Sequence, residues 1–345
     1  MKKHVLITGG AGFIGINTAD YFLARNYGVT IFDNLSRKGS AENLKWLKKK
    51  WGKQFLFVRG DVVTDKKKLA LLAERADAVL HLAAQVAVTT SVENPYDDFH
   101  TNAHGTINEV EAVRHSKRRP LVIYSSTNKV YGAMEGAEVT LTDAGYRHTN
   151  FPIGVASHHP VDFHSPYGCS KGAADIYVHD YGRMYGLKTV VFRQSCIYGP
   201  HQFGIEDQGW VAWFAIATLL DKGLTIYGTG KQVRDILHVK DLVELYELAI
   251  NNIETVSGKA YNVGGGPQNN MSLLNLIDML ESRSNKKINL KYAQPRAGDQ
   301  PIFISDIRRA DKEMNWKPKH DISAGFENMM VWIEKNQSVF KKFFE

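Results

Sequence analysis

The feature that most limits how this chain can fold is an alternation of short apolar runs with helix-like segments over its first 130 residues. The runs are rich in Val, Ile, Leu and Phe, and they cover residues 4–9, 28–33, 55–61, 78–84 and 121–126. Another run, at 189–195, follows a long helix that we expect to begin near Tyr167. Continuous apolar runs that alternate with helices are typical of a parallel sheet covered on both faces. The sequence therefore predicts an α/β fold with a doubly wound parallel sheet.

The alternation loosens after Gly199-Pro200, where turns become frequent. We expect a first domain over residues 1–195, to which 235–262 returns. Residues 196–234 and 263–345 are expected to form a smaller C-terminal substrate-binding lobe. Residues 133–164 form a long insertion without a clear period, and a loop of that length in a compact domain is usually functional.

The net charge of +7 raises the question of nucleic acid as a partner. The one dense basic stretch, "KWLKKKWGK" at 45–53, alternates lysines with Trp46, Leu47 and Trp51. That pattern favours an amphipathic helix at the sheet edge over a nucleic-acid or membrane patch. A mild positive excess also suits a small anionic substrate.

The rest of the composition indicates a cytoplasmic protein. No apolar stretch approaches the ~18 residues of a membrane span, and an apolar run begins directly after the first residues, so we expect no signal peptide. The two cysteines, Cys169 and Cys196, make neither a disulfide framework nor a metal cluster, which favours a reducing compartment.

A glycine-rich turn, "TGGAGFIG" at 8–15, follows the first strand and opens a helix. Side chains at Gly9, Gly12 or Gly15 would block the tight turn, the approach of the backbone to a pyrophosphate, or the packing of helix on strand. Asp33 ends the second strand, where a carboxylate binds the adenosine ribose and repels a 2′-phosphate. The motif therefore predicts a Rossmann-type dinucleotide site rather than a purely structural turn, and Asp33 favours NAD over NADP, although Arg37 nearby would tolerate a 2′-phosphate.

Polar residues follow the strand at 121–126, and Tyr167 stands four residues before Lys171. Residues i and i+4 share one face of a helix, so the ammonium of Lys171 is expected beside the phenol. A phenol with a pKa near ~10 is a poor base at neutral pH, but a neighbouring ammonium and an oxidised nicotinamide both favour the phenolate. By themselves, Tyr167 and Lys171 also fit a core tyrosine and a surface lysine.

Together with Thr127, these motifs resemble the extended short-chain dehydrogenase/reductase family, the nucleotide-sugar epimerases and dehydratases, over essentially the whole chain. The resemblance implies that Tyr167 is the acid/base, that Thr127 hydrogen-bonds the reacting sugar hydroxyl, and that Lys171 binds the nicotinamide ribose. It also implies nucleotide-sugar contacts at Arg234 and Arg296, and a homodimer or larger homo-oligomer such as a tetramer. The expected NAD-binding residues are Gly9, Gly12, Phe13, Ile14, Gly15, Asp33, Asn34, Ser36, Arg37, Asp61, Val62, Leu82, Ala83, Ala84, Gln85, Asn102, Ser125, Tyr167 and Lys171.

The residues after Thr127 indicate which reaction is excluded. Family members that eliminate water resemble "STDEVYG", with an acidic pair, whereas this chain has Asn128-Lys129 in "SSTNKVYG". An amide and a cation cannot perform that acid/base work, so epimerisation is favoured. Because such a cycle is redox-neutral, NAD is expected to stay tightly bound.

Four segments, at 125–132, 163–175, 207–214 and 230–238, resemble more closely the family members that invert C2 of CDP-hexoses. A departure from the wider 4-epimerases is Cys196, where a substrate-binding Asn is common. A 4-epimerase or reductase on another nucleotide sugar, and a non-enzymatic NAD sensor, stay open as alternatives. The expected substrate-binding residues are Thr127, Asn128, Lys129, Arg193, Ser195, Cys196, Gln208, Gly209, Trp210, Arg234 and Arg296.

Overall fold

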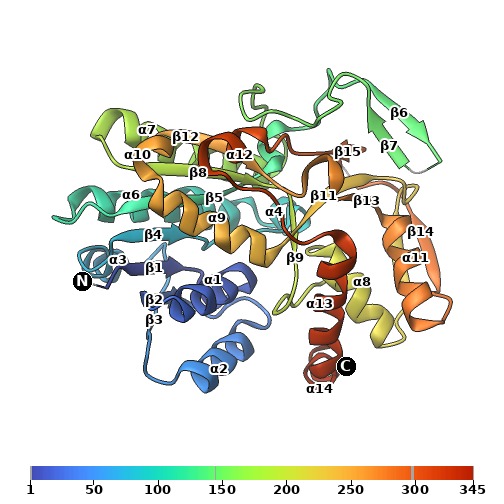
Figure 1. Cartoon of the computed structure of the whole chain (residues 1–345), viewed down its shortest axis with the longest axis horizontal. Coiled ribbons are helices and arrows are strands. Elements are labelled where there is room, and N and C mark those ends of the chain that lie inside the picture. Colours follow the sequence, from blue (N-terminus) through green and yellow to red (C-terminus); the bar gives the residue numbers. More distant parts are fainter. Residues whose placement is uncertain (1, 144, 297–298, 345) are drawn as a thin grey trace.

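The computed structural model describes residues 2–143, 145–296 and 299–344. Its centre is a seven-stranded parallel sheet in the order β12-β8-β5-β4-β1-β2-β3 (Figure 1). The strands are β1 (His4–Thr8), β2 (Gly28–Asp33), β3 (Leu56–Arg59), β4 (Ala78–His81), β5 (Leu121–Thr127), β8 (Thr189–Gln194) and β12 (Lys259–Val263). The first six agree with the predicted apolar runs, which confirms the doubly wound α/β fold.

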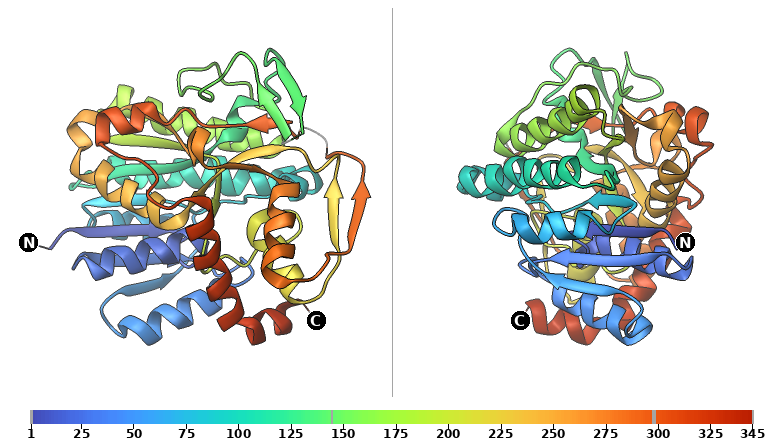
Figure 2. Two further views of the ribbon diagram at one scale, coloured as in Figure 1. Left: turned by 45° about the vertical axis from the view of Figure 1, so that its right-hand side comes forward. Right: turned by 90° about the vertical axis from the view of Figure 1, so that its left-hand side faces the viewer.

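Helices cover both faces of this sheet (Figures 1 and 2). Apolar side chains of one face pack on α1 (Phe13–Ala24), α2 (Ser40–Trp51), α9 (Val239–Asn251), α10 (Ile253–Val256) and α12 (Arg308–Met314). The other face packs on α3 (Lys66–Ala73), α6 (Gly105–His115) and α7 (Ser165–Tyr185). Three short helical segments, α4 (Val88–Glu93), α5 (Pro95–Phe99) and the π-helix His100–His104, lead into α6. The apolar strands are therefore buried on both sides, as their sequences required.

A smaller second part adjoins the carboxyl ends of the strands. It contains a four-stranded sheet of β9 (Cys196–Tyr198), β11 (Val233–His238), β13 (Asn270–Ser272) and β15 (Ile302–Phe303), and a parallel pair of β10 (Leu224–Tyr227) and β14 (Leu290–Ala293). Its helices are α8 (Trp210–Leu219), α11 (Leu273–Ser284), α13 (Ile322–Lys335) and α14 (Gln337–Phe344), which share a second apolar core. Short 3-10 turns cover Asn128–Tyr131 and Gly266–Gln268.

The segment 235–262 joins the two parts. β11 pairs with strands of the smaller sheet, whereas α9 packs on the large sheet and β12 extends its edge. The division into 1–195 with 235–262 and 196–234 with 263–345 stays a proposal; its boundary at residue 235 falls within β11, which pairs with strands of the smaller sheet along its whole length.

The insertion at 133–164 contains a short antiparallel hairpin of β6 (Val139–Thr142) and β7 (Gly145–His148), which the sequence did not predict. The hairpin stands out from the rest of the molecule in Figure 1. The backbone N–H of Tyr146 donates to the carbonyl of Lys231 at 3.1 Å, so contact with the second part helps to hold it.

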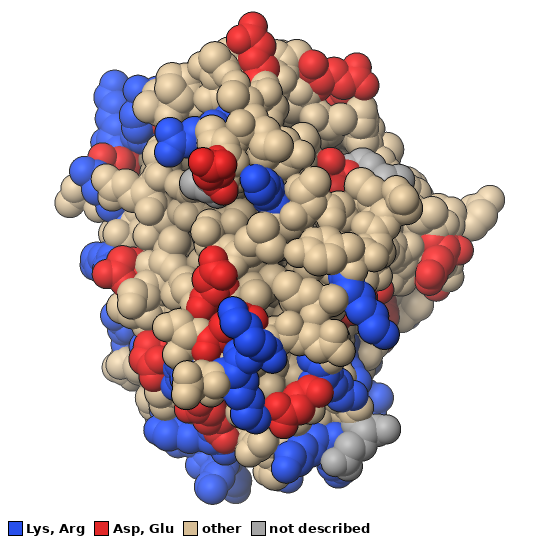
Figure 3. All heavy atoms as spheres, turned by 90° about the vertical axis from the view of Figure 1, so that its right-hand side faces the viewer, with Lys and Arg blue, Asp and Glu red and all other residues tan. Residues whose placement is uncertain are grey.

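The basic stretch at 45–53 lies mostly in α2, with Leu44 and Leu47 buried and Lys48, Lys49 and Lys50 exposed. The amphipathic helix is therefore confirmed. On the face that Figure 3 shows, Lys and Arg are interspersed with Asp and Glu. Among the described residues, no helix is long and apolar enough to cross a membrane.

Candidate functional site

The glycine turn joins β1 to α1 at the point where the sheet order reverses. The φ of Gly9 is +68°, and a Cβ added there would lie 2.7 Å from the backbone nitrogen of Ala83, in the loop after β4. A Cβ at Gly15 would lie 2.4 Å from the carbonyl oxygen of Gly9. Gly12 caps α1 without a side-chain hydrogen bond, so the first amides of the helix are free to bind an anion. The turn is thus a cradle of backbone that fits a pyrophosphate.

Asp33 stands at the other side of this cradle, at the end of β2. Its carboxylate accepts hydrogen bonds from the backbone N–H of Leu35 at 2.7 Å and of Ala11 at 2.9 Å. Burial raises the pKa of Asp33, and these backbone hydrogen bonds oppose the rise. Asp33 fixes the loop that follows β2 and presents a carboxyl group at the rim of the cavity, which fits the ribose of NAD.

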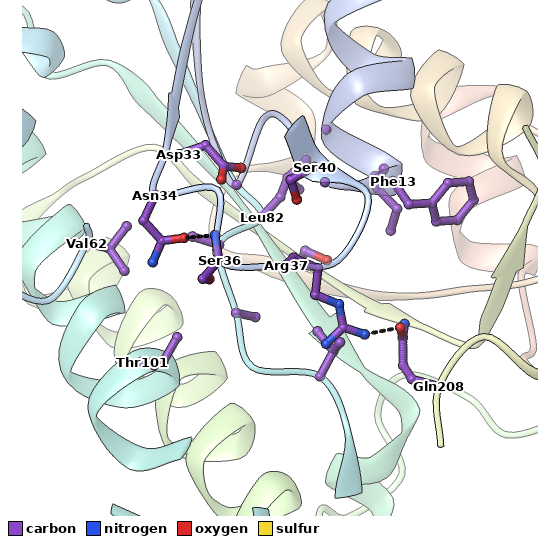
Figure 4. Close-up of a pocket in the computed structure, with 18 of the residues that line it drawn as sticks. Phe13, Asp33, Asn34, Ser36, Arg37, Ser40, Val62, Leu82, Thr101 and Gln208 are labelled. Carbon is purple, nitrogen blue, oxygen red and sulfur yellow. Dashed lines mark hydrogen bonds between the residues drawn. The ribbon is translucent and has the colours of Figure 1, made fainter. Parts of the chain in front are cut away.

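Figure 4 shows the cavity that these elements enclose. Most of the expected NAD-binding residues line it, namely Gly9, Gly12, Phe13, Ile14, Gly15, Asp33, Asn34, Ser36, Arg37, Asp61, Val62, Leu82, Ala83, Ala84, Ser125, Tyr167 and Lys171. Thr127 lines it as well, so the glycine turn and the three expected catalytic residues share one space. We call this space the cofactor cavity.

Arg37 spans part of the cofactor cavity. In Figure 4 its guanidinium group donates a hydrogen bond to Oε1 of Gln208, which precedes α8. Gln208 was predicted to bind substrate, and the structure places it on the wall of the cofactor cavity. Burial lowers the pKa of Arg37, and the proximity of Tyr167 opposes that effect. The arginine therefore joins the loop after β2 to the smaller part of the molecule.

The reacting centre is buried at the carboxyl end of β5. Tyr167 is 8% exposed and Lys171 is 3% exposed, and Nζ of Lys171 donates to the carbonyl of Ser125 at 2.6 Å. Burial lowers the pKa of Lys171 to about 7, against the opposing charges of Asp175 and Asp98. The helical spacing thus brings the lysine to the same cavity as the phenol, although its ammonium lies over the ring of Tyr124, 4.3 Å from the ring centroid, rather than against Tyr167.

The pKa of Tyr167 differs from the expectation. Burial raises it to about 12, and the hydrogen bond with Thr127 and the charge of Arg37 only partly oppose this. Lys171 does not offset the rise, because its own ammonium is destabilised by the same burial. The protein's own groups therefore keep the phenol protonated at neutral pH.

Gln85 and Asn102, which were expected to bind NAD, do not line the cavity. They hydrogen-bond each other, with the Gln85 N–H donating to Oδ1 of Asn102 at 2.9 Å, and Nδ2 of Asn102 donating to Oγ of Ser170 at 3.0 Å. The carboxylate of Asp98 accepts from Gln85 and from Ser170. These side chains brace the loop after β4 against α7, so they hold Tyr167 in place from behind the cavity.

Arg193 also lies outside the cavity. Its guanidinium pairs with Asp175 at 2.9 Å and donates to the Tyr131 hydroxyl and to the carbonyl of Ser157, both at 3.1 Å. These contacts are all made within the protein, and this position gives no support to the predicted role in substrate binding.

Most of the other expected substrate residues do not line the cofactor cavity. Of this set, only Ser195, Gln208 and Thr127 line the cofactor cavity. Nε1 of Trp210 donates to Sγ of Cys196 at 3.4 Å, and Gly209 has a φ of +76° and caps α8. Nitrogen NH2 of Arg296 lies 3.0 Å from the carboxylate of Asp207. Of the remaining members, Asn128 and Lys129 directly follow β5, and Arg234 lies in β11.

Several wall residues were missed by the sequence analysis. They are Phe32, Lys38, Ser40, Asn43, Gly60, Val86, Thr101, Ser126, Gln194, Ile197, His201, Gln202 and Phe203. The segment 201–203 is brought in by side-chain contacts: Nδ2 of Asn17 donates to the carbonyl of Pro200 at 2.9 Å, and Nδ2 of Asn43 to that of His201 at 3.2 Å. No sequence motif indicates this approach. Within the described ranges, no three His, Cys, Asp or Glu side chains are grouped so as to hold a metal ion.

A glycine turn that fits a dinucleotide, beside a Thr-Tyr-Lys centre, is typical of the short-chain dehydrogenases/reductases. Comparison with known proteins assigns the chain to the same class. The family model described as GDP-mannose 4,6 dehydratase matches residues 6–329, so the chain belongs to this family of extended short-chain dehydrogenases/reductases. Within it, the chain is 44% identical to the CDP-paratose 2-epimerase of Salmonella typhi over 95% of this chain and 98% of that protein.

Two solved structures extend the comparison. The UDP-glucose 4-epimerase of Thermus thermophilus in complex with NAD is 29% identical, with a TM-score of 0.81 and coverage of 96% of this chain and 99% of that one. The UDP-glucuronic acid 4-epimerase of Bacillus cereus in complex with UDP-glucuronic acid and NAD is 27% identical, with a TM-score of 0.83 and the same coverage.

Proposed function

We propose that this protein is an NAD-dependent epimerase that inverts C2 of a CDP-linked hexose of the CDP-paratose or CDP-tyvelose type. The observation that carries the proposal is the 44% identity to a CDP-paratose 2-epimerase over 95% of the chain, joined to a cavity that holds Thr127, Tyr167 and Lys171. The glycine cradle and Asp33 fit NAD as the cofactor.

The reaction needs a temporary oxidation, because the C–H bond of a sugar alcohol is too weakly acidic for direct removal of its proton. Bound NAD supplies the acceptor of a hydride and afterwards its donor. Tyr167 takes the hydroxyl proton of C2 and returns it after the 2-keto sugar has turned over. Thr127 holds the oxygen atom through its hydroxyl group.

The raised pKa of Tyr167 adds a condition to this scheme. The phenol is protonated at neutral pH when it is surrounded by the protein's own groups alone. It becomes a base only when further positive charge stabilises the phenolate, as an oxidised nicotinamide would do. Proton transfer is thus tied to the loaded state of the enzyme.

The residues after Thr127 support epimerisation over dehydration. Asn128 is buried, and its Oδ1 accepts a hydrogen bond from the Thr127 hydroxyl at 3.4 Å. Lys129 is engaged with Asp299, and neither side chain offers the acid and base that elimination of water requires. The lack of an acid/base pair at Asn128 and Lys129 argues against a dehydration reaction in this chain, although the family model is described as a dehydratase.

A CDP-sugar carrying deuterium at C2 tests the proposal. The inverted product should keep the label at C2 in ordinary water, because the hydride returns to the carbon that it left. Loss of the label to solvent would indicate proton exchange instead. Inversion at C4 with C2 untouched would establish the second candidate, a 4-epimerase, which the two solved 4-epimerase structures favour. A complete lack of turnover with CDP- and UDP-hexoses would leave a non-enzymatic NAD sensor.

We also propose that the protein is a homo-oligomer and that it binds NAD tightly. Exposed apolar side chains on the packed helices α4, α5 and α7 support a subunit interface, and they are Val92, Tyr96, Phe99, Ile176, Tyr177, Met184 and Tyr185. Sedimentation velocity should give a multiple of the 38.8 kDa chain mass. A cytoplasmic location is likewise proposed, with Cys169 and Cys196 both free.

A further inference from the structure

Three charged side chains meet beside the exit of β5. Nζ of Lys129 lies 3.5 Å from Oδ1 of Asp299, and the same oxygen atom accepts a hydrogen bond from NH2 of Arg234 at 2.7 Å. They come from distant elements, because Lys129 follows β5, Arg234 lies in β11 and Asp299 precedes β15. We call these three residues the Lys129 cluster.

The cluster carries an excess positive charge in a confined place. Burial works to raise the pKa of Asp299, but Arg234 and Lys129 outweigh it, so the net effect lowers the pKa and the carboxylate is ionised. Burial and the charge of Arg234 lower the pKa of Lys129, which Asp299 opposes. One carboxylate thus serves two cations. A partly desolvated cation with a shared counter-ion is a good partner for a second anion.

Among the described residues, no second carboxylate forms an ion pair with either cation of the cluster. The guanidinium group of Arg234 donates its other hydrogen bonds to the carbonyl oxygens of Val233 and Gln300, which are neutral. Sγ of Cys196 is a further neighbour of both cations, and burial raises the pKa of this thiol, so it is neutral too.

The cluster also lies next to the reacting centre. The backbone N–H of Lys129 donates to Oγ1 of Thr127 at 3.3 Å, and a Cβ at Gly168, the neighbour of Tyr167, would lie 3.2 Å from the carbonyl oxygen of Lys129. An enzyme that acts at C2 of a nucleotide sugar must hold the anionic diphosphate close to its acid/base, because the diphosphate is attached at C1, the adjacent carbon. An enzyme that acts at C4 has no such constraint.

We propose that Lys129 is a specificity-determining ligand of the substrate's diphosphate, which displaces Asp299 from the ammonium when the substrate binds. This inference rests on the proposed function. Asp299 acts as an internal anion that keeps Lys129 paired before binding, and Arg234 is the second cation of the grip. The pull of Lys129 brings C1 toward β5 and so places C2, rather than C4, between Thr127 and Tyr167.

A purely structural ion pair predicts the opposite behaviour. If Lys129 and Asp299 only fasten the segment 299–303 to β5, then removal of either charge should loosen the site. Both substitutions would then weaken nucleotide binding, with no distinction between one phosphate group and two. The diphosphate grip instead predicts that the two substitutions change binding in opposite directions.

The test measures the affinity of the NAD-containing protein for CDP and CMP by calorimetry. Lys129→Met should weaken CDP by about 10- to 100-fold, as expected for one charge-assisted hydrogen bond, and should leave CMP within about 3-fold. Lys129→Arg should retain most of the CDP affinity. Lys291→Met, in which an exposed lysine of β14 is lost, is the matched control and should change neither value.

The reverse substitution sharpens the test. Asp299→Asn should tighten CDP by several-fold and leave CMP unchanged, because the competing carboxylate is gone. The inference is overturned if Lys129→Met weakens CDP and CMP equally, if it weakens neither, or if Asp299→Asn weakens CDP. Repeating the comparison with UDP and UMP separates this inference from the proposed function. If Lys129→Met loses the preference for the diphosphate over the monophosphate in both the cytidine and the uridine series, the inference is supported. Tighter binding of the uridine nucleotides would contradict only the CDP-sugar assignment.

Discussion

The buried layer behind the cofactor cavity contains Glu109, and the protonation state of this residue in the folded protein can be tested quantitatively. It lies on α6 with 0% exposure, and neither carboxyl oxygen has a hydrogen-bond partner within the described residues. The nearest basic group is Nδ1 of His81, at 3.8 Å from Oε2. Both ring nitrogens of His81 are already engaged, with the hydroxyl groups of Thr8 at 2.7 Å and Thr106 at 2.9 Å.

This environment holds Glu109 in its neutral form. Burial raises its pKa from 4.5 to about 8, and burial together with the charge of Lys171 lowers the pKa of His81 to about 3. A carboxyl whose pKa is higher in the folded state stabilises the fold fully below pH ~4.5, and that contribution is lost as the pH rises toward ~8. From pH 5 to pH 7.5 the loss is on the order of 3 kcal/mol.

Glu109→Gln removes this dependence, because the amide is neutral at every pH and has nearly the same shape. Relative to the unmodified protein, the variant should gain on the order of 4 °C in its unfolding midpoint when the pH is raised from 5 to 7.5. Differential scanning calorimetry at both pH values measures the change. Comparing the two pH values cancels any constant effect of the amide on packing.

Glu111→Gln is the matched control on the same helix. Its carboxylate hydrogen-bonds Arg114, which lowers its pKa to about 2, so the stability that it contributes is present above pH ~4.5 and lost as the pH falls. That variant should be destabilised at both pH values, with no gain at the higher one. An equal midpoint difference for Glu109→Gln at pH 5 and pH 7.5 would show that Glu109 is ionised in the folded state, and would refute the reasoning.

Four further outcomes are expected. Tyr167→Phe should abolish nearly all epimerisation and leave the NAD content of the purified protein unchanged, as measured by chromatography of the heat-denatured supernatant. Thr127→Ala should lower kcat by about 10²-fold, the usual effect of one positioned hydrogen bond, and a loss below about 3-fold would remove Thr127 from the mechanism. The released dinucleotide should be NAD, and finding only NADP would contradict the role given to Asp33. CDP-glucose should yield no 4-keto-6-deoxy sugar by NMR, and a ketone formed as fast as the epimer would overturn the interpretation of Asn128 and Lys129.

The parts that could be predicted from sequence depend on local geometry. In the glycine turn, a side chain at Gly9 or Gly15 would collide with nearby backbone, so both positions require glycine. The two residues lie within a few positions of each other in the chain. The spacing of Tyr167 and Lys171 likewise follows from one helix. Such features can be read from sequence because the constraint and the residues that satisfy it are neighbours in the chain.

The parts that were missed depend on partners from distant elements. Asn102 is turned away from the cavity by Ser170 and Asp98, and Arg193 is held by Asp175 on α7. The pKa of Tyr167 could not be predicted from the presence of Lys171, because the burial of both groups decides it. The hairpin β6–β7 has only four residues in each strand, which is too short for a clear alternation.

The loop after β2 has a consequence for the order in which this enzyme can mature. Arg37 contacts Gln208, the ring of Phe203 lies against the position that a Cβ of Gly39 would take, and Nζ of Lys38 donates to the carbonyl of Phe343 at 2.5 Å. A ribosome that has made the glycine turn and Asp33 has therefore made only part of the cofactor's enclosure. The rest of the wall arrives with later segments, the last of them ending at Gln208, so a nascent chain cannot enclose the dinucleotide before that segment has been made.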